Sequence, residues 1–286
     1  MVAPLRAIIV EAKYRSEPAG STTGIDILGM HAKKSLGQNF LTCRWVADTM
    51  IHASDVTKKD TVLEIGPGQG ALTRPLASRA GRIIAIEKDE ALARELRESL
   101  KKDGISNVEI VEGDTLKFPK EKLKSFKTFT VVANIPYYLT SRLFRYFLES
   151  APRPKTIVFT VQKEVAERIV ARPGNMNLLA LSIQSFGKAE KIKNVPRECF
   201  SPKPDVESAI IRVSGISDEF FRKNKIPPER FFEIARLAFG KKRKMLSSSL
   251  KTVISPDVLE RAGIHKNARP QELEIEEWAR LCRAVQ

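Results

Sequence analysis

Cysteine is scarce in this chain of 286 residues, which contains only three. They are Cys43, Cys199 and Cys282. They are odd in number and far apart, and none belongs to a Cys-x-x-Cys pair, which argues against a disulfide framework and against a thiolate metal site. The sequence therefore predicts free thiols in a reducing compartment, which we take to be the cytoplasm.

Histidine and long apolar runs are also in short supply. His31, His52 and His265 are too scattered to suggest a metal site, so no metal is expected. No apolar stretch is long enough to cross a bilayer, and no membrane partner is expected. The apolar run at 5–10 is too short for a signal peptide, and nearby acidic residues argue against a transit peptide. We expect residues 1–30 to form a flexible extension, with Met30 as an alternative start of translation.

Acidic residues are fewer than basic residues in this chain. The chain has 49 Lys and Arg against 34 Asp and Glu, which gives a net charge of +15 and a pI near 9.8. Such an excess indicates a nucleic-acid partner, although an anionic membrane surface or simple solubility would produce the same balance. Four consecutive basic residues concentrate this charge at Lys241, Lys242, Arg243 and Lys244. Taken alone, a run of this kind more often marks a solvated helix start.

The order of apolar segments predicts a doubly wound α/β sheet. Strands are expected near 61–65, 83–86, 108–111, 128–133, 156–161 and 207–213. Beyond Ser214 the strand signals end and helical spacing dominates. We therefore expect a catalytic domain at 31–214 and a small helical domain at 215–286, whose apolar stripes form its core.

A glycine-rich turn follows the first strand. Gly66, Gly68 and Gly70 permit positive φ and a close approach of the backbone to a nucleotide-like cofactor. Glu87 ends the next strand about twenty residues later, the offset at which a carboxylate meets ribose hydroxyls. Asp114 ends the third strand and is a candidate acceptor for an adenine amine, or an ordinary turn residue. The spacing Gly-x-Gly-x-Gly differs from the Gly-x-Gly-x-x-Gly typical of NAD sites.

The segment from Asn134 to Tyr137 directly follows the fourth predicted strand. An exocyclic adenine amine is a poor nucleophile, so an enzyme that methylates it must hold both N–H groups. The Asn134 side-chain oxygen can accept one N–H and the Ile135 carbonyl the other, while Pro136 fixes the local φ. Tyr137 offers a flat face to the base. Alone, the same four residues are consistent with a strand that ends in a common turn.

Five ordered motifs together resemble the small-subunit ribosomal RNA adenine dimethyltransferases, which use S-adenosylmethionine (SAM). They are Lys33–Leu41, Glu64–Gly70, Asn134–Tyr138, Gln162–Ala166 and Phe200–Ala209. The resemblance covers the chain from about Ala32 to the C-terminus. One position departs mildly, because Glu207 stands where the family usually has Asp.

The resemblance implies a cofactor, a reaction and a set of site residues. SAM contacts are expected from Asn39, Leu41, Gly66, Gly68, Glu87, Asp114 and Asn134, and Phe200 is expected to form a second aromatic wall opposite Tyr137. The basic run at 241–244 corresponds to a helix that faces rRNA, and Lys33 and Lys34 extend the same surface. The implied partner is small-subunit rRNA or a precursor of the small ribosomal subunit, the implied reaction is N6 dimethylation of two adjacent adenosines in the 3′-terminal hairpin loop, and a monomer is expected.

Three other functions fit parts of the sequence. A large-subunit rRNA adenine methyltransferase of the antibiotic-resistance kind shares the Asn-Ile-Pro-Tyr segment, but the Phe200–Ala209 motif and the basic run favour the small-subunit branch. In a DNA or protein amine methyltransferase, this segment usually has Pro at its third position and a further Pro or an aromatic residue before Tyr. A non-catalytic assembly factor on the same fold would have no need to keep Glu87, Asp114 and Asn134.

Overall fold

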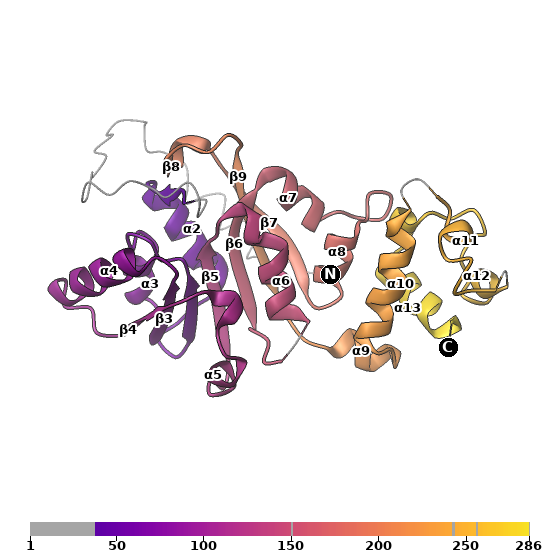
Figure 1. The fold of residues 1–286 in the computed structure, drawn as a ribbon, viewed down its shortest axis with the longest axis horizontal. Helices are drawn as coiled ribbons and strands as arrows, with labels where there is room; N and C mark the ends of the chain where they lie inside the picture. Colours follow the sequence, from indigo (N-terminus) through magenta and orange to yellow (C-terminus); the bar gives the residue numbers. More distant parts are fainter. Residues whose placement is uncertain (1–37, 150, 242–243, 256, 286) are drawn as a thin grey trace, which may run out of the picture. The chain divides into compact units, whose positions relative to one another are not determined.

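One mixed β-sheet of seven strands organises the fold (Figure 1). The structure is a computed structural model that describes residues 38–149, 151–241, 244–255 and 257–285. Along the sheet the strands follow the order β4-β3-β2-β5-β6-β9-β7. Their bounds are Thr61–Ile65 (β2), Arg82–Glu87 (β3), Val108–Glu112 (β4), Phe129–Asn134 (β5), Thr156–Gln162 (β6), Lys188–Val195 (β7) and Ser208–Ser214 (β9).

The order in which strands are added to the sheet reverses at β2, the central strand of the parallel part. From β2 the sheet grows through β3 to β4, and the chain then returns to place β5 on the other side of β2; all of these pairs are parallel. Strand β9 runs antiparallel to both β6 and β7. In such sheets a crevice opens beyond the carboxyl ends of the two strands that flank the reversal. Here those ends are Ile65 and Asn134.

The six strands predicted from the sequence are confirmed to within two residues at each end. The sheet also has a seventh strand, β7, and an antiparallel edge. Strand β7 has three exposed lysines, Lys188, Lys191 and Lys193, and a bulge between Lys191 and Lys193. Charged side chains and bulges of this kind protect a sheet edge from pairing with another chain.

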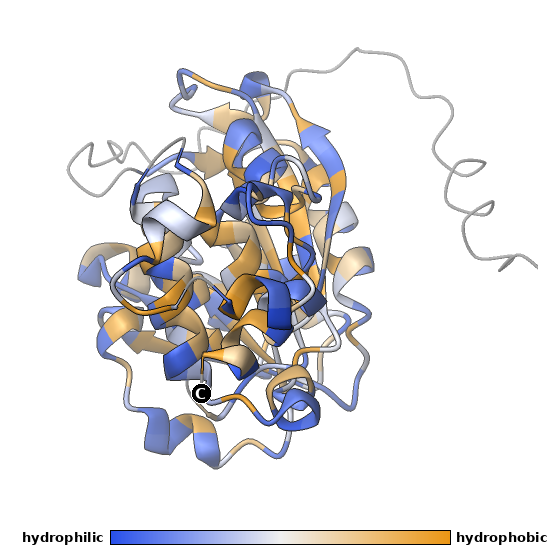
Figure 2. Ribbon diagram, turned by 90° about the vertical axis from the view of Figure 1, so that its right-hand side faces the viewer, coloured by the Kyte–Doolittle hydropathy of each residue, from blue (hydrophilic) through white to orange (hydrophobic). Residues whose placement is uncertain are grey.

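Two apolar layers cover the sheet, because successive side chains of a strand point to opposite faces. Val62 and Val132 pack with α2 and α3, whereas Leu63 and Val131 pack with α6 and α8. Figure 2 shows the hydrophobic residues mainly on the inner strands and the hydrophilic residues mainly on the loops and outer helix surfaces. The helix bounds are Arg44–Ser54 (α2), Thr73–Ala77 (α3), Glu90–Lys102 (α4), Lys120–Lys124 (α5), Thr140–Leu148 (α6), Lys163–Ile169 (α7) and Leu178–Gln184 (α8).

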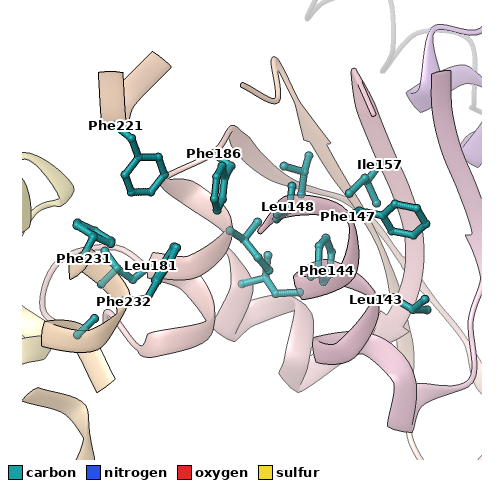
Figure 3. Packing of buried hydrophobic residues seen from close by; sticks show 14 of the residues in the cluster. Leu143, Phe144, Phe147, Leu148, Ile157, Leu181, Phe186, Phe221, Phe231 and Phe232 are labelled. Carbon is teal, nitrogen blue, oxygen red and sulfur yellow. The ribbon is translucent and has the colours of Figure 1, made fainter. Parts of the chain in front are cut away.

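Helices follow the last strand, as predicted; beyond Ser214 the described residues contain no strand. The predicted core stripe is confirmed, since Phe231, Ile234 and Trp278 are fully buried. Figure 3 shows Phe231 and Phe232 near Leu181 and Phe186 in one apolar cluster that continues from the sheet. The division at 214/215 into two domains stays a prediction. These helices are Glu219–Asn224 (α9), Pro228–Gly240 (α10), Leu246–Ser249 (α11), Val258–Arg261 (α12) and Ile275–Ala284 (α13).

The remaining elements of the described chain are 3₁₀ turns and a short β-ribbon. The 3₁₀ turns are Thr115–Lys117 (η2), Tyr137–Leu139 (η3), Arg197–Cys199 (η4) and Pro270–Glu272 (η5). A separate two-stranded ribbon pairs Phe40–Leu41 (β1) with Phe200–Ser201 (β8) in antiparallel register. This ribbon joins the start of the described chain to a segment about 160 residues later, and it carries residues of the candidate site.

The expectation of three free thiols is wrong, because Cys43 and Cys199 form a disulfide. The ribbon explains the pairing: the Thr42 N–H donates to the Cys199 carbonyl over 2.9 Å, and the two cysteine Cα atoms lie 4.9 Å apart. Of the three cysteines only Cys282 is free. Burial raises the pKa of its thiol to about 12. No helix among the described residues is long and apolar enough to cross a membrane.

Candidate active site

A cavity of about 110 Å³ lies at the carboxyl ends of the parallel strands. Its lining brings together every predicted cofactor-binding and catalytic residue. These are Asn39, Leu41, Gly66, Gly68, Glu87, Asp114, Asn134, Ile135, Pro136, Tyr137 and Phe200. The predicted RNA-binding residues are not part of this lining: Lys241 and Lys244 lie elsewhere, and Lys33, Lys34, Lys242 and Arg243 lie outside the described residues.

The glycine-rich turn after β2 has the conformation that its sequence predicts. Gly66, Gly68 and Gly70 have φ values of +62°, +54° and +81°, a region in which residues with a Cβ are strained. At Gly68 a Cβ would also approach the Phe40 ring of the β1–β8 ribbon to 3.0 Å. The turn therefore needs glycine both for its backbone and for its packing against the ribbon.

Glu87 ends β3 and ties the strand to the glycine turn. One carboxylate oxygen accepts the Gly68 N–H over 3.0 Å, and the other accepts the Asp89 N–H over 2.9 Å. Burial raises the pKa of Glu87, while these N–H groups oppose the rise. Each oxygen retains a lone pair. The carboxylate is thus held rigidly and can still accept hydrogen bonds from the hydroxyl groups of a ribose.

Asp114 is held at the next strand end by two contacts. Its Oδ1 accepts the Leu116 N–H over 3.0 Å, and its Oδ2 lies 3.3 Å from the Lys88 ammonium. Burial alone would raise the pKa of Asp114, but the Leu116 N–H and Lys88 outweigh it, so the pKa is lowered. Asp114 is therefore ionised at neutral pH and is a fixed acceptor beside the cavity.

Glu64, which sequence reasoning did not single out, is the most perturbed carboxyl group of the cavity. It lies on β2, is 1 % exposed and lines the cavity, and among the described residues its Oε2 has no hydrogen-bond partner. Burial raises its pKa to about 8; the nearby Thr73 hydroxyl opposes the rise, and the charge of Glu87 adds to it. An unpartnered buried carboxyl oxygen is costly unless something binds it. This oxygen fits a cofactor with a positively charged group.

Asn134 is fixed from both sides of its side-chain amide. Its Nδ2 donates to the Asn39 carbonyl over 2.9 Å, and its Oδ1 accepts the hydroxyl of Thr160 on β6. Thr160 is fully buried. An amide with both ends engaged cannot rotate freely, and its oxygen retains one further lone pair. The Asn134 oxygen can therefore still accept the adenine N–H, as predicted from the sequence.

The two aromatic residues of the site are anchored differently. The Tyr137 and Ser208 hydroxyls share a hydrogen bond of 2.6 Å, which ties η3 to β9. Burial raises the pKa of Tyr137, so the phenol stays neutral. Phe200 is only 4 % exposed and packs in the apolar layer under α2, yet it also lines the cavity. Its position next to Cys199 places it at the end of the disulfide-linked ribbon.

Three residues that support this site carried little signal in the sequence. Thr160 lies in an apolar strand and looks like an ordinary β-branched strand residue. Ser208 stands within the recognised Phe200–Ala209 motif, which marked its position but not its partner Tyr137. Of the three, Glu64 could most easily have been predicted from the sequence, because a charged residue within a buried strand, directly before a glycine turn, is unusual.

The sheet order, the glycine turn, the acidic strand ends and the Asn-Ile-Pro-Tyr segment together define a SAM-dependent methyltransferase. The comparisons with known proteins are more specific. A family model described as "Ribosomal RNA adenine dimethylase" matches residues 29–286, and the chain belongs to this family.

Curated relatives match over most of their length. The chain is 40% identical over 261 residues to "Ribosomal RNA small subunit methyltransferase A" of Dehalococcoides mccartyi, which covers 88% of each chain. It is 38% identical over 274 residues to the protein of the same name from Pelotomaculum thermopropionicum, with 89% of this chain and 91% of the relative covered.

Two solved structures are similar in fold and in sequence. A dimethyladenosine transferase from Plasmodium falciparum has a TM-score of 0.74 and 28% identity, and the match covers 85% of this chain and 95% of that one. The 23S rRNA methyltransferase ErmE has a TM-score of 0.68 and 29% identity, with 86% of this chain and 99% of that one covered. The chain is therefore an rRNA adenine N6-dimethyltransferase that uses SAM.

Proposed function

We propose that this enzyme dimethylates N6 of two adjacent adenosines in the 3′-terminal hairpin loop of small-subunit rRNA, as a step in ribosome biogenesis in the cytoplasm. The observation that carries the proposal is the fixed Asn134 amide at the edge of the cavity, next to Tyr137. The relatives named for the small-subunit activity support the choice of substrate.

In this proposal, Asn134 makes the target amine reactive. Its Oδ1 and the Ile135 carbonyl each accept one N–H of adenine N6, which turns the nitrogen lone pair toward the methyl donor. The Asn39 carbonyl and the Thr160 hydroxyl keep the amide in place, so orientation costs little when the base arrives. No basic side chain is needed, because the nitrogen becomes acidic once it carries the new methyl group and water can accept the proton.

The cofactor side of the cavity would be formed by the glycine turn and its acidic neighbours. When bound, SAM supplies an electrophilic methyl group on a sulfonium. Glu87 would accept hydrogen bonds from the ribose hydroxyls and Asp114 from the adenine amine, while Gly66 and Gly68 leave room along the backbone. Asn39 and Leu41, from the segment beside the cavity, would complete the contacts.

Tyr137 and Phe200 would hold the target base. Stacking on aromatic side chains contributes about 1–3 kcal/mol per base, which offsets part of the cost of unstacking it. A loop adenosine is already poorly stacked and is therefore the less costly substrate. After one transfer N6 keeps one N–H, and a second round with fresh SAM gives the dimethylated product.

Basic residues outside the cavity would hold the rest of the RNA. We assign this role to the run at 241–244 together with Lys33 and Lys34, acting from a helical domain at 215–286 and from the entry segment. Their phosphate contacts would be largely independent of sequence and strongly dependent on salt. We expect the protein to act as a monomer.

The test is transfer of tritiated methyl groups from SAM to small ribosomal subunits that lack the modification. Two dimethylated adenosines require incorporation that approaches four methyl groups per subunit. The similarity to ErmE makes a large-subunit substrate the second candidate, so large-subunit rRNA and adenine-containing duplex DNA are assayed in parallel. Preferential labelling of either would overturn the assignment.

A further inference from the structure

A second cavity, of about 210 Å³, lies among four helices away from the site described above. Helix α8 contacts α6, α7 and α10, and Figure 1 shows α8 between α6 beside the sheet and α10. The cavity has an apolar floor and a charged rim. The floor consists of Phe144, Leu148, Leu178, Leu179 and Phe232.

Arginine dominates the charged rim. Arg145 comes from α6, Arg168 from α7 and Arg236 from α10, and Glu149 is the only acidic residue in the lining. Three positive charges and one negative charge leave a net charge of +2. Burial raises the pKa of Glu149, while Arg145 and Arg236 oppose the rise, which places both arginines within electrostatic reach of this carboxyl group.

Two of these guanidinium groups are available to bind a ligand. Within the described part of the chain, the side chains of Arg168 and Arg236 form no hydrogen bond and no ion pair. Among the described residues, Arg145 pairs only with Glu149, over 3.5 Å and on the same helix. By contrast, Arg74 on the opposite part of the sheet is held by three hydrogen bonds. The rim of the second cavity therefore offers several N–H donors to an anion.

We propose that this cavity binds a backbone phosphate of the substrate RNA. A planar guanidinium matches two phosphate oxygens at once, which makes arginine the preferred residue for such contacts. The floor is rigid: Phe144 packs edge-to-face on Phe159 of the sheet, and Figure 3 shows Phe144 and Leu148 in the same apolar cluster as Phe232. The packed helices fix the backbone of each arginine, so that binding has to order only the side chains themselves.

The position of Arg236 favours RNA over a small free anion. It lies on α10 about one helical turn before the helix ends at Gly240, and the basic run begins at Lys241. The cavity is thus continuous along the chain with the surface proposed to hold rRNA, and it would extend that surface toward the sheet. The inference rests on the proposed RNA substrate and adds a specific site to it.

The test uses the double variant Arg168→Gln/Arg236→Gln, which removes two charges and keeps side-chain length. Binding to unmodified small ribosomal subunits is measured as a function of salt. Affinity at low salt should fall about 10- to 50-fold, and the slope of log K against log salt should become shallower by about 1.4–1.8, the value for two phosphate contacts. Lysine at both positions should restore the slope but only part of the affinity.

The matched control is Arg79→Gln/Arg94→Gln, since both residues are exposed and lie on the α3–α4 side of the sheet. It removes the same charge and should change affinity less than twofold. SAM binding by calorimetry should be unchanged in both variants, which shows that the fold is intact. Equal effects of the two variants on RNA binding would overturn the proposal. It would also be overturned if adenosine monophosphate raised the melting temperature of the wild-type protein but not of the cavity variant, while both proteins bound RNA equally well.

The wild-type methylation assay distinguishes failure of the phosphate site from failure of the proposed function. If wild-type protein methylates small subunits and the cavity variant binds them like the control, this inference fails and the proposed function stands. If wild-type protein labels only another RNA, and the cavity variant binds that RNA more weakly and with a shallower salt slope, the proposed substrate fails and the phosphate site stands.

Discussion

Thr160 on β6 donates a hydrogen bond to the side-chain oxygen of Asn134 on β5, directly beside the cavity. We expect Thr160→Val to lower kcat about 10- to 100-fold, because the amide loses one of its two restraints and small errors in position are costly in catalysis. KM for RNA and for SAM should change less than about threefold. Thr160→Ser should restore kcat, because it keeps the hydroxyl group.

A buried threonine on the neighbouring strand provides the control. Thr130 on β5 is also fully buried, but its hydroxyl has no hydrogen-bond partner in the part of the chain that the structure describes. Thr130→Val should therefore leave kcat unchanged and should not destabilise the protein. If Thr160→Val and Thr130→Val reduced kcat equally, the hydrogen bond to Asn134 would have no catalytic role.

Asn134 and Glu87 should separate catalysis from cofactor binding. Asn134→Ala is expected to reduce methyl transfer by at least about two orders of magnitude with little change in SAM affinity, since its interactions with the amine act mainly in the transition state. Glu87→Ala should weaken SAM binding first. Calorimetry with SAM and single-turnover methyl transfer measure the two effects.

The control for Glu87 is its register partner on β4. Glu112 lies opposite Glu87 in the sheet, but it is exposed and pairs with Arg97 on the surface. Glu112→Ala should leave SAM affinity unchanged. The division of roles would be refuted by an equal loss of SAM binding in Asn134→Ala and Glu87→Ala.

Much of this fold could be predicted because its signals are local. The parallel strands are short apolar runs, and buried strands of this kind are recognisable wherever they occur. The glycines at Gly66, Gly68 and Gly70 revealed their positive φ because no other residue adopts it without strain. Glu87 followed from its spacing, Asp114 from its place at a strand end and Asn134 from the chemistry of its segment, and the cavity contains all three.

What could not be predicted depends on contacts between distant segments. The Cys43–Cys199 disulfide requires the β1–β8 ribbon, and strands of two residues leave no periodicity to detect. Half of the residues of β7 are charged, and the strand lies at a sheet edge, so its apolar signal is weak. Thr160 looked like any strand residue until the pairing of β5 with β6 placed it against Asn134.

Glu64 should make stability depend on pH. Its folded pKa of about 8 lies above the ordinary value of 4.5, so the folded protein holds a proton that the unfolded chain releases. The stability contribution is fully present below pH 4.5 and is lost as pH rises through the folded pKa, at up to about 1.4 kcal/mol per pH unit. Glu64→Gln, which cannot titrate, should remove this part of the dependence.

The measurement is the free energy of unfolding in urea between pH 5 and pH 8.5, in the absence of SAM. The wild-type protein should lose stability relative to Glu64→Gln as the pH rises, and comparing the two cancels the contribution of every other titrating group. Parallel curves would mean that Glu64 titrates in the folded protein as it does in the unfolded chain.

The basic run should contribute to RNA affinity through charge. We expect that replacing all four residues of the run at 241–244 with Ser weakens binding to small subunits and reduces the slope of log K against log salt by about 0.7–0.9 for each phosphate that the variant no longer neutralises. SAM binding should not change, because the described residues of the run, Lys241 and Lys244, do not line the SAM cavity. The control replaces four exposed lysines of the sheet region with Ser, namely Lys101, Lys102, Lys124 and Lys127. An unchanged slope in the variant of the run, or an equal reduction in the control, would show that the run is only a solvated segment of a basic protein.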